Sequence, residues 1–307
     1  MKKYLVTGGA GFIGSNIAFA LEAERKAQVA VLDDFSSGDY RNLLGFKGDV
    51  VADTILSKDW FPKAGKVDAV FHQAAVVDTT ETDQRKMMAV NVDGFRNVLE
   101  YAREYGVKRV VYASSAAVYG NSACPMHEQQ QPTPENVYGF SKAIMDNVAM
   151  EFAAAHKGMT IVGLRYFNVY GPREYYKGKM ASMVYQLYRQ MKAGKRPRIF
   201  KFGEQMRDFV YVKDLVRANL NALDAERSCV CNAATGKPGN FNEVIEAINK
   251  ALKTDLAPEY FDNPYGFYQH KTQADLRQAR ALLNYRPEWS LADGVADYVK
   301  VLEKAKI

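Results

Sequence analysis

The amino-terminal segment passes from an apolar run into a helical pattern across a glycine-rich turn. Tyr4–Val6 is typical of a buried strand, and Ile13, Ile17 and Leu21 then recur at the spacing of one helix face. This alternation continues through the first half of the chain. Further strands are predicted at Val29–Leu32, Gly48–Val51, Ala69–His72, Arg109–Ser114 and Ile161–Tyr166, and helices at 13–25, 84–105 and 138–156. The pattern predicts an α/β fold with a doubly wound parallel sheet.

The regular alternation fades after about residue 172. A segment rich in Tyr, Lys and Met covers 175–192, and a loop rich in Tyr, Phe and Pro covers 259–271. Between them the pattern predicts strands at 198–202, 209–212 and 229–232 and helices at 213–225 and 241–253. We therefore expect a main domain at 1–171. A smaller C-terminal lobe at 172–307 would be interleaved with the last elements of the main sheet.

Composition indicates an ordinary globular protein. The chain has 307 residues, 48% of them hydrophobic and 25% charged, and a net charge of +6. The basic residues are scattered, so they favour an anionic ligand over nucleic acid, for which no binding module is present. The uncharged stretch 4–21 resembles a signal peptide, but its glycines and Asn16 interrupt it, and no other stretch could span a membrane. We expect a cytoplasmic protein with no membrane contact.

The three cysteines indicate no metal site. Cys229 and Cys231 share one face of a predicted strand, and Cys124 stands alone. Because no second cysteine pair or histidine cluster accompanies them, we expect buried thiols in a reducing compartment.

The glycine-rich turn has the spacing of a dinucleotide-binding site. Gly8 permits a tight turn after the strand, Gly11 lets backbone N–H groups approach phosphates, and Gly14 lets the helix lie close to the sheet. Glycine turns often serve geometry alone. Here, however, the next strand ends in Asp33 and Asp34, where an acid commonly binds a ribose hydroxyl. The pattern favours a Rossmann domain that binds a nicotinamide cofactor.

A second group of residues supplies redox chemistry. Tyr138 and Lys142 lie four positions apart and so share one helix face, and Ser115 follows a predicted strand. A lysine ammonium and an oxidised nicotinamide both favour phenolate, so we expect a lowered pKa for Tyr138. By itself Tyr-x-x-x-Lys is common on protein surfaces. On a dinucleotide fold, the three residues indicate oxidation of an alcohol or reduction of a ketone.

Three motifs in this order, TGGAGFIG (7–14), ASSAAVYG (113–120) and YGFSK (138–142), resemble the extended short-chain dehydrogenase/reductase family, which acts on nucleotide sugars. RYFNVYGPRE (165–174), KGKMAS (177–182), RDFVY (207–211), TQAD (272–275) and DTTE (78–81) resemble its ADP-heptose 6-epimerases. The resemblance implies oxidation at carbon 6 by NADP and return of hydride to the opposite face of the ketone. It also implies a product used in lipopolysaccharide core synthesis, catalysis by Tyr138, Lys177, Lys142 and Ser115, and a homo-oligomer.

The resemblance also assigns the remaining site residues. The residues expected at the cofactor are Gly8, Gly11, Phe12, Ile13, Gly14, Asp33, Asp34, Arg41, Gln73, Ala74, Ala75, Val76, Val77, Asn91, Lys142 and Val169. Those expected at the sugar nucleotide are Thr79, Asn168, Lys179, Gln186, Phe200, Lys201, Phe202, Gly203, Arg207 and Tyr268. Asn91 could instead brace the surrounding loops, and Tyr268 could simply pack in its aromatic loop.

Two departures from the family pattern leave alternatives open. Asp33 and Asp34 disfavour the 2′-phosphate of NADP, with Arg41 as the only compensating charge, so NAD is the alternative cofactor. Lys179 and Gln186 replace other groups of the family, so the sugar specificity is open. A UDP-hexose 4-epimerase is the alternative enzyme, because one Tyr and a rotating ketone suffice for it and Lys177 would have no catalytic role. A dehydratase would need an Asp-Glu pair at 116–117, where this sequence has two alanines, so we do not expect dehydration. A nucleotide-binding redox sensor would need no Ser, Tyr and Lys set.

Overall fold

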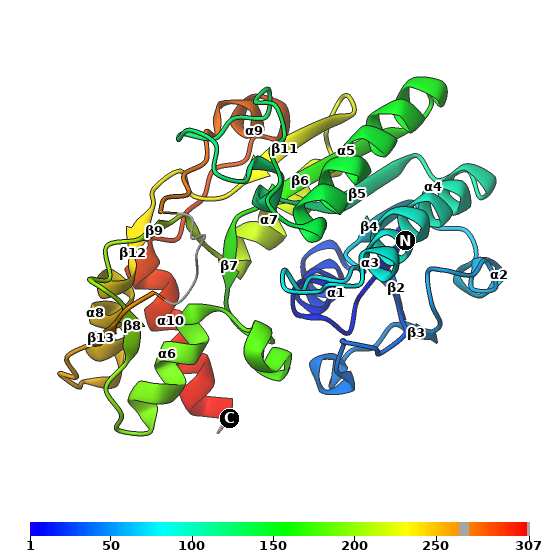
Figure 1. Ribbon diagram of the computed structural model, residues 1–307. Helices are drawn as coiled ribbons and strands as arrows, with labels where there is room; N and C mark the ends of the chain where they lie inside the picture. Colours follow the sequence, from blue (N-terminus) through cyan, green and yellow to red (C-terminus); the bar gives the residue numbers. More distant parts are fainter. Residues whose placement is uncertain (264–269, 306–307) are drawn as a thin grey trace.

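In the computed structural model, which describes residues 1–263 and 270–305, a seven-stranded parallel sheet forms the core of the first lobe, and the second lobe lies beside it (Figure 1). Its spatial order is β11-β6-β5-β4-β1-β2-β3. These strands are β1 (Lys3–Thr7), β2 (Gln28–Asp33), β3 (Asp49–Ala52), β4 (Ala69–His72), β5 (Arg109–Ser115), β6 (Thr160–Tyr166) and β11 (Cys229–Ala233). All neighbours pair in parallel, so the predicted doubly wound α/β fold is confirmed. The order reverses at β1, where ligands of such sheets bind.

Helices cover both faces because successive strand residues point to opposite sides. In β1, Val6 packs in a core that includes Ile17 of α1 (Phe12–Arg25) and Leu215 of α7 (Val212–Ala222). Leu5 points the other way, into a core that includes Phe95 and Met145. These two residues belong to α4 (Gly94–Glu104) and α5 (Val137–Ala155). Continuous apolar strands are therefore buried on both sides.

The segment predicted as one helix over 84–105 has three parts. It forms α3 (Gln84–Met88), a π-helical turn η2 (Ala89–Asp93) and α4. The predicted helix is therefore present as one continuous helical segment over 84–104, and the periodicity did not register the π turn within it. The π turn contains Asn91, whose side chain is buried and hydrogen-bonded to a neighbouring loop. Such turns are frequent at functional sites.

The second lobe contains α6 (Met183–Lys192), α8 (Phe241–Leu252) and α10 (Leu291–Ala305), which lie together in Figure 1. Its strands form two-stranded ladders: β7 (Asn168–Tyr170) with β10 (Phe209–Tyr211), β9 (Met206–Arg207) with β12 (Gly239–Asn240), and β8 (Arg198–Phe200) with β13 (Glu259–Phe261). The predicted aromatic loop thus opens with a strand. The remaining short elements are η1 (Tyr40–Leu43), α2 (Phe61–Ala64), η3 (Ala116–Tyr119), η4 (Tyr175–Met180) and α9 (Arg277–Leu283).

The described residues contain no helix long and apolar enough to cross a membrane, and no group of metal-ligating side chains. Cys229 and Cys231 are buried in β11 with their sulfurs 3.8 Å apart, whereas Cys124 is half-buried. All three are free thiols.

Candidate active site

The glycine turn lies at the carboxyl end of β1 and leaves no room for side chains. Gly8 has a φ of +66°, and its N–H donates to the carbonyl of Leu32 at 2.8 Å. A Cβ on Gly14 would lie 2.1 Å from the carbonyl oxygen of Gly8. The close approach of α1 to β1 therefore requires glycine at both positions.

The amino end of α1 fits a cofactor phosphate. Gly11 occupies the N-cap position, so no capping side chain accepts hydrogen bonds from the first turn, and that turn carries no acid. Unpaired N–H groups and the helix dipole favour an anion there. Phe12 is buried and Ile13 is half-buried beside this turn. The residues present therefore suit the pyrophosphate of a dinucleotide.

The acids after β2 shape their own loop. The two carboxylate oxygens of Asp33 accept the N–H groups of Ala10 and Phe35, each at 2.8 Å. Burial nevertheless raises the pKa of Asp33. Asp34 accepts the N–H and the hydroxyl of Ser36. Arg41 forms an exposed ion pair with a third acid, Asp39.

The segment at 73–77, here called the strip, follows β4, and hydrogen bonds from Asn91 hold it in place. Asn91 accepts the Val76 N–H at 2.8 Å and donates to the Val76 carbonyl at 3.0 Å and to Ser141 Oγ at 2.9 Å. With its side chain fully buried, Asn91 braces the strip, which was one of its two expected roles. Gln73 accepts the Tyr166 hydroxyl at 3.0 Å. Ala74, Ala75 and Val76 are half-buried, and Val77 is exposed.

The structure brings Tyr138, Ser115 and Lys142 together. Asn136 caps α5 by accepting the Gly139 N–H at 2.8 Å, so the helix begins at the predicted motif. Tyr138 is hydrogen-bonded to Ser115. The surrounding protein raises the pKa of Tyr138, and the bond to Ser115 opposes this. The expected lowering is thus not a property of the protein alone, because desolvation of the phenolate outweighs the favourable contact.

Lys142 is anchored beneath the Tyr138 ring. Its ammonium nitrogen donates to the Ala113 carbonyl at 2.8 Å and lies 5.8 Å from the centroid of the Tyr138 ring. Its side chain is almost completely buried, and desolvation lowers the pKa of Lys142 to about 8, with Asp146 acting in the opposite direction. The Lys142 ammonium group can therefore orient the Tyr138 ring and stabilise a negative charge on its oxygen.

Lys177 reaches the same region from the second lobe. It lies in η4, and its ammonium nitrogen is 5.6 Å from the Phe12 ring centroid, beside the glycine turn. Burial lowers the pKa of Lys177, and neighbouring Glu174 opposes this. Glu174 is itself buried and holds the turn by accepting the N–H and hydroxyl of Ser182 at 2.6 and 2.9 Å. A lysine on the solvated surface would have neither a pKa lowered by burial nor an ammonium group beside a ring of the other lobe.

The predicted substrate residues are spread over the second lobe and its border. Asn168 and Val169 lie in β7, where Asn168 accepts the Thr272 hydroxyl at 3.3 Å. Gln186 ties α6 to the Lys179 carbonyl at 3.2 Å. The other residues lie in β8 and β9, in the turn between them and on an exposed surface: Phe200, Lys201, Phe202, Gly203, Arg207 and Thr79. Tyr268 lies outside the described residues.

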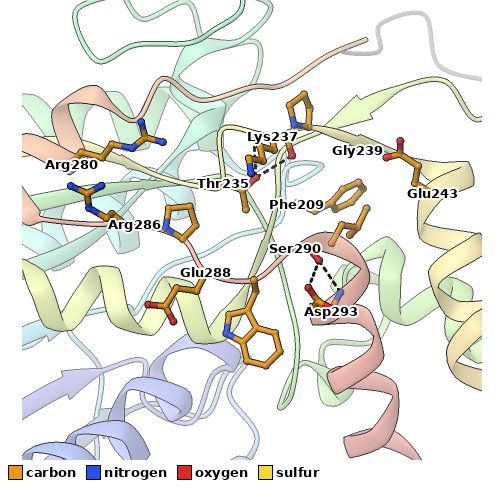
Figure 2. Close-up of a pocket in the computed structure, with 14 residues that line it drawn as sticks. Phe209, Thr235, Lys237, Gly239, Glu243, Arg280, Arg286, Glu288, Ser290 and Asp293 are labelled. Carbon is orange, nitrogen blue, oxygen red and sulfur yellow. Dashed lines mark hydrogen bonds between the residues drawn. The ribbon is translucent and has the colours of Figure 1, made fainter.

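Sequence patterns missed one organising residue, Asp208. It is fully buried and accepts the N–H groups of Thr235, Gly236 and Ala274 at 2.8 to 3.0 Å, which joins three segments beside Arg207. An acid next to a predicted ligand was the available signal. By contrast, the cavity of about 540 Å³ in Figure 2 contains no predicted site residue. Its lining residues include Phe209, Lys237, Arg280, Arg286 and Trp289.

Comparisons with known proteins agree over nearly the whole chain. The model of the NAD dependent epimerase/dehydratase family matches residues 4–234. An ADP-L-glycero-D-manno-heptose-6-epimerase of Brachyspira hyodysenteriae is 38% identical over 313 residues, which cover 98% of each chain. The crystal structure of ADP-L-glycero-D-manno-heptose-6-epimerase from Helicobacter pylori has a TM-score of 0.91 at 43% identity, covering 98% of this chain and 96% of that one. UDP-glucose 4-epimerase of Thermotoga maritima has a TM-score of 0.91 at 31% identity, covering 99% and 100%.

Proposed function

The chain belongs to the NAD dependent epimerase/dehydratase family, and on this premise we propose that it interconverts ADP-D-glycero-β-D-manno-heptose and its L-glycero epimer at carbon 6. The similarity to two heptose epimerases over almost their full lengths supports this substrate. One observation carries the proposal beyond the family: Lys177 is brought to the glycine turn, 5.6 Å from the Phe12 ring. A second acid/base group, carried by an element other than α5, is thereby available beside the glycine turn.

The proposed chemistry divides between two proton-transfer groups. When bound, a nicotinamide cofactor would supply the hydride acceptor and donor for carbon 6. Tyr138, hydrogen-bonded to Ser115, serves the carbon-6 hydroxyl on one face, and Lys142 keeps a positive charge beneath the ring. Lys177 serves the same oxygen after the flat ketone has turned its other face. Because carbon 6 lies outside the sugar ring, rotation about one bond is sufficient for that change.

We propose NADP as the cofactor, with NAD as the alternative. Arg41 is the only Lys or Arg between residues 27 and 46, and it follows the strand whose end faces the adenosine half in this fold. Both oxygens of Asp33 are engaged by backbone N–H groups, which weakens its claim on a ribose hydroxyl. Calorimetric titration with each cofactor separates the two.

NMR of purified protein with the D-glycero substrate in ²H₂O tests the reaction. We expect inversion at carbon 6 with retention of its hydrogen, because the hydride returns from the same cofactor instead of from solvent. Lys177→Ala should slow inversion about 100-fold, because one proton-transfer group is lost, whereas Lys195→Ala, an exposed lysine of the second lobe, should leave it unchanged. If neither NADP⁺ nor NAD⁺ supports inversion while UDP-glucose is epimerised at carbon 4, the heptose assignment is wrong. Uptake of solvent deuterium at carbon 6 would exclude the hydride mechanism.

A further inference from the structure

The η4 turn, which carries Lys177, is anchored in the second lobe by the first of three consecutive side chains. Tyr175 stacks on Tyr298 of α10, with ring centroids 6.2 Å apart, and lies 6.0 Å from Tyr185 of α6. The amino end of the turn is thereby part of the aromatic core of the second lobe. Its position follows that lobe.

The next side chain contacts the first lobe. The guanidinium carbon of Arg41 lies 3.8 Å from the centroid of the Tyr176 ring. Arg41 is held in turn by Asp39, with its Nε donating to Oδ1 at 2.8 Å, and the Asp39 N–H donates to the Ala10 carbonyl at 3.0 Å. A continuous series of contacts thus joins Tyr176 to the glycine turn through the loop that follows β2.

The position of this contact in the turn matters. Lys177 comes directly after Tyr176 and is followed by Gly178, which has a φ of +56° and no atom within 4 Å of an added Cβ. Among the described residues, no side chain or distant backbone therefore packs against Gly178, and the turn is closed there only by its own bond from the Ala181 N–H to the Gly178 carbonyl. The Tyr176 ring is placed to fix the lysine from the side of the first lobe.

We propose that Arg41 and Tyr176 are a positioning pair that holds the Lys177 turn over the glycine turn. The stack makes the location of Lys177 depend on the loop at the adenosine end of the cofactor site. This inference rests on the proposed roles of Lys177 and of the dinucleotide. Loss of the Tyr176 ring should leave Tyr175 in its core and release the ammonium group toward solvent.

Chemical labelling of the Lys177 amine reports whether the stack holds this side chain in place, and the experiment needs no sugar substrate. Purified protein would be labelled with acetic anhydride, with and without NADP⁺, and the modified lysines quantified by peptide mass spectrometry against the exposed Lys195. In Tyr176→Leu we expect labelling of Lys177 to rise about threefold, the size of effect that one exposed cation–π contact provides. Tyr176→Phe retains the ring and should label like the wild type. NADP⁺ should protect Lys177 less in Tyr176→Leu than in the wild type.

A matched control lies in the second lobe. Arg198 stacks over Phe261 at 4.8 Å and donates to Glu259 at 3.1 Å, the same arrangement away from Lys177, and Arg198→Ala should not change the labelling. If Tyr176→Leu does not fold, Arg41→Met removes the same stack from an exposed residue, and its labelling is compared without NADP⁺ because Arg41 is also the proposed partner of the 2′-phosphate. Unchanged labelling of Lys177 in a folded variant overturns the proposal. A wrong sugar assignment would leave the labelling result intact, so the two failures are distinguishable.

The pH profile gives a second readout that a purely structural role would not move. Burial lowers the pKa of Lys177, so its release toward solvent raises that pKa toward the ordinary value. The limb of the kcat/KM profile that depends on Lys177 should therefore move to higher pH in Tyr176→Leu, and return in Tyr176→Phe. A limb that stays at the wild-type pH in a variant of reduced activity contradicts a positioning role.

Discussion

The two segments that carry the proposed acid/base groups are built in opposite ways. In α5, the Tyr138 and Lys142 side chains share a helix face, the Asn136 cap sets the start of the helix, and Lys142 is fixed by the Ala113 carbonyl. In η4, three successive side chains contact three different parts of the molecule, and Lys177 lies between two of them and an open glycine. One lysine is placed by local geometry and the other by the meeting of two lobes.

This difference indicates how each segment responds to change. Two side chains four residues apart on a helix stay aligned as long as the helix exists. A turn held by long-range contacts moves when any one of its partners moves, without unfolding of the domain. Substitutions in η4 should therefore affect chemistry more than stability, and substitutions in the α5 start should affect both.

The largest effect is expected from Tyr138→Phe, which removes the acid/base hydroxyl and keeps the ring above Lys142. We expect kcat to fall about 1,000-fold, within the usual range for loss of general acid–base catalysis. Thermal stability should stay close to that of the wild type, because Ser115 keeps its bond from the Ala117 N–H. Tyr105→Phe, in the same lobe, is the matched control. A variant within tenfold of wild-type kcat would remove Tyr138 from the mechanism.

The helix pair and the glycine turn could be predicted from sequence because each is a short-range pattern. For Asn91 the sequence left two roles open, because its hydrogen bond to Ser141 joins residues fifty positions apart. The contact of Lys177 with Phe12 joins residues far apart in the sequence and has no local signature, so it was not predicted; the family resemblance indicated only the role of each residue. Tyr176 and Asp208 were not found, because their importance comes from which segments they join.

Lys177→Met should have a smaller effect, with kcat for inversion falling about 100-fold, since only one face of the ketone loses its proton-transfer group. Tyr138 remains, so the variant should still oxidise one epimer, and the absorbance of reduced nicotinamide should appear faster than the inverted product. In Tyr138→Phe the same signal should be absent for that epimer. If Lys177→Met loses both signals equally while binding the cofactor normally, the two segments do not divide the reaction.

The smallest effects are expected from alanine substitutions at two glycines, Gly139 in α5 and Gly178 in η4. A Cβ on Gly139 would lie 2.5 Å from the Ala117 carbonyl, a backbone atom that cannot move aside, so Gly139→Ala should lower the free energy of unfolding by about 1–3 kcal/mol. Gly178 has open space but a φ of +56° and ψ of −125°, so Gly178→Ala should bend the turn for about 1 kcal/mol. Urea unfolding together with kcat separates them. Because Lys177 is adjacent, Gly178→Ala should lose more activity per unit of stability than Gly139→Ala, and the reverse order would mean that η4 is held more rigidly than its contacts imply.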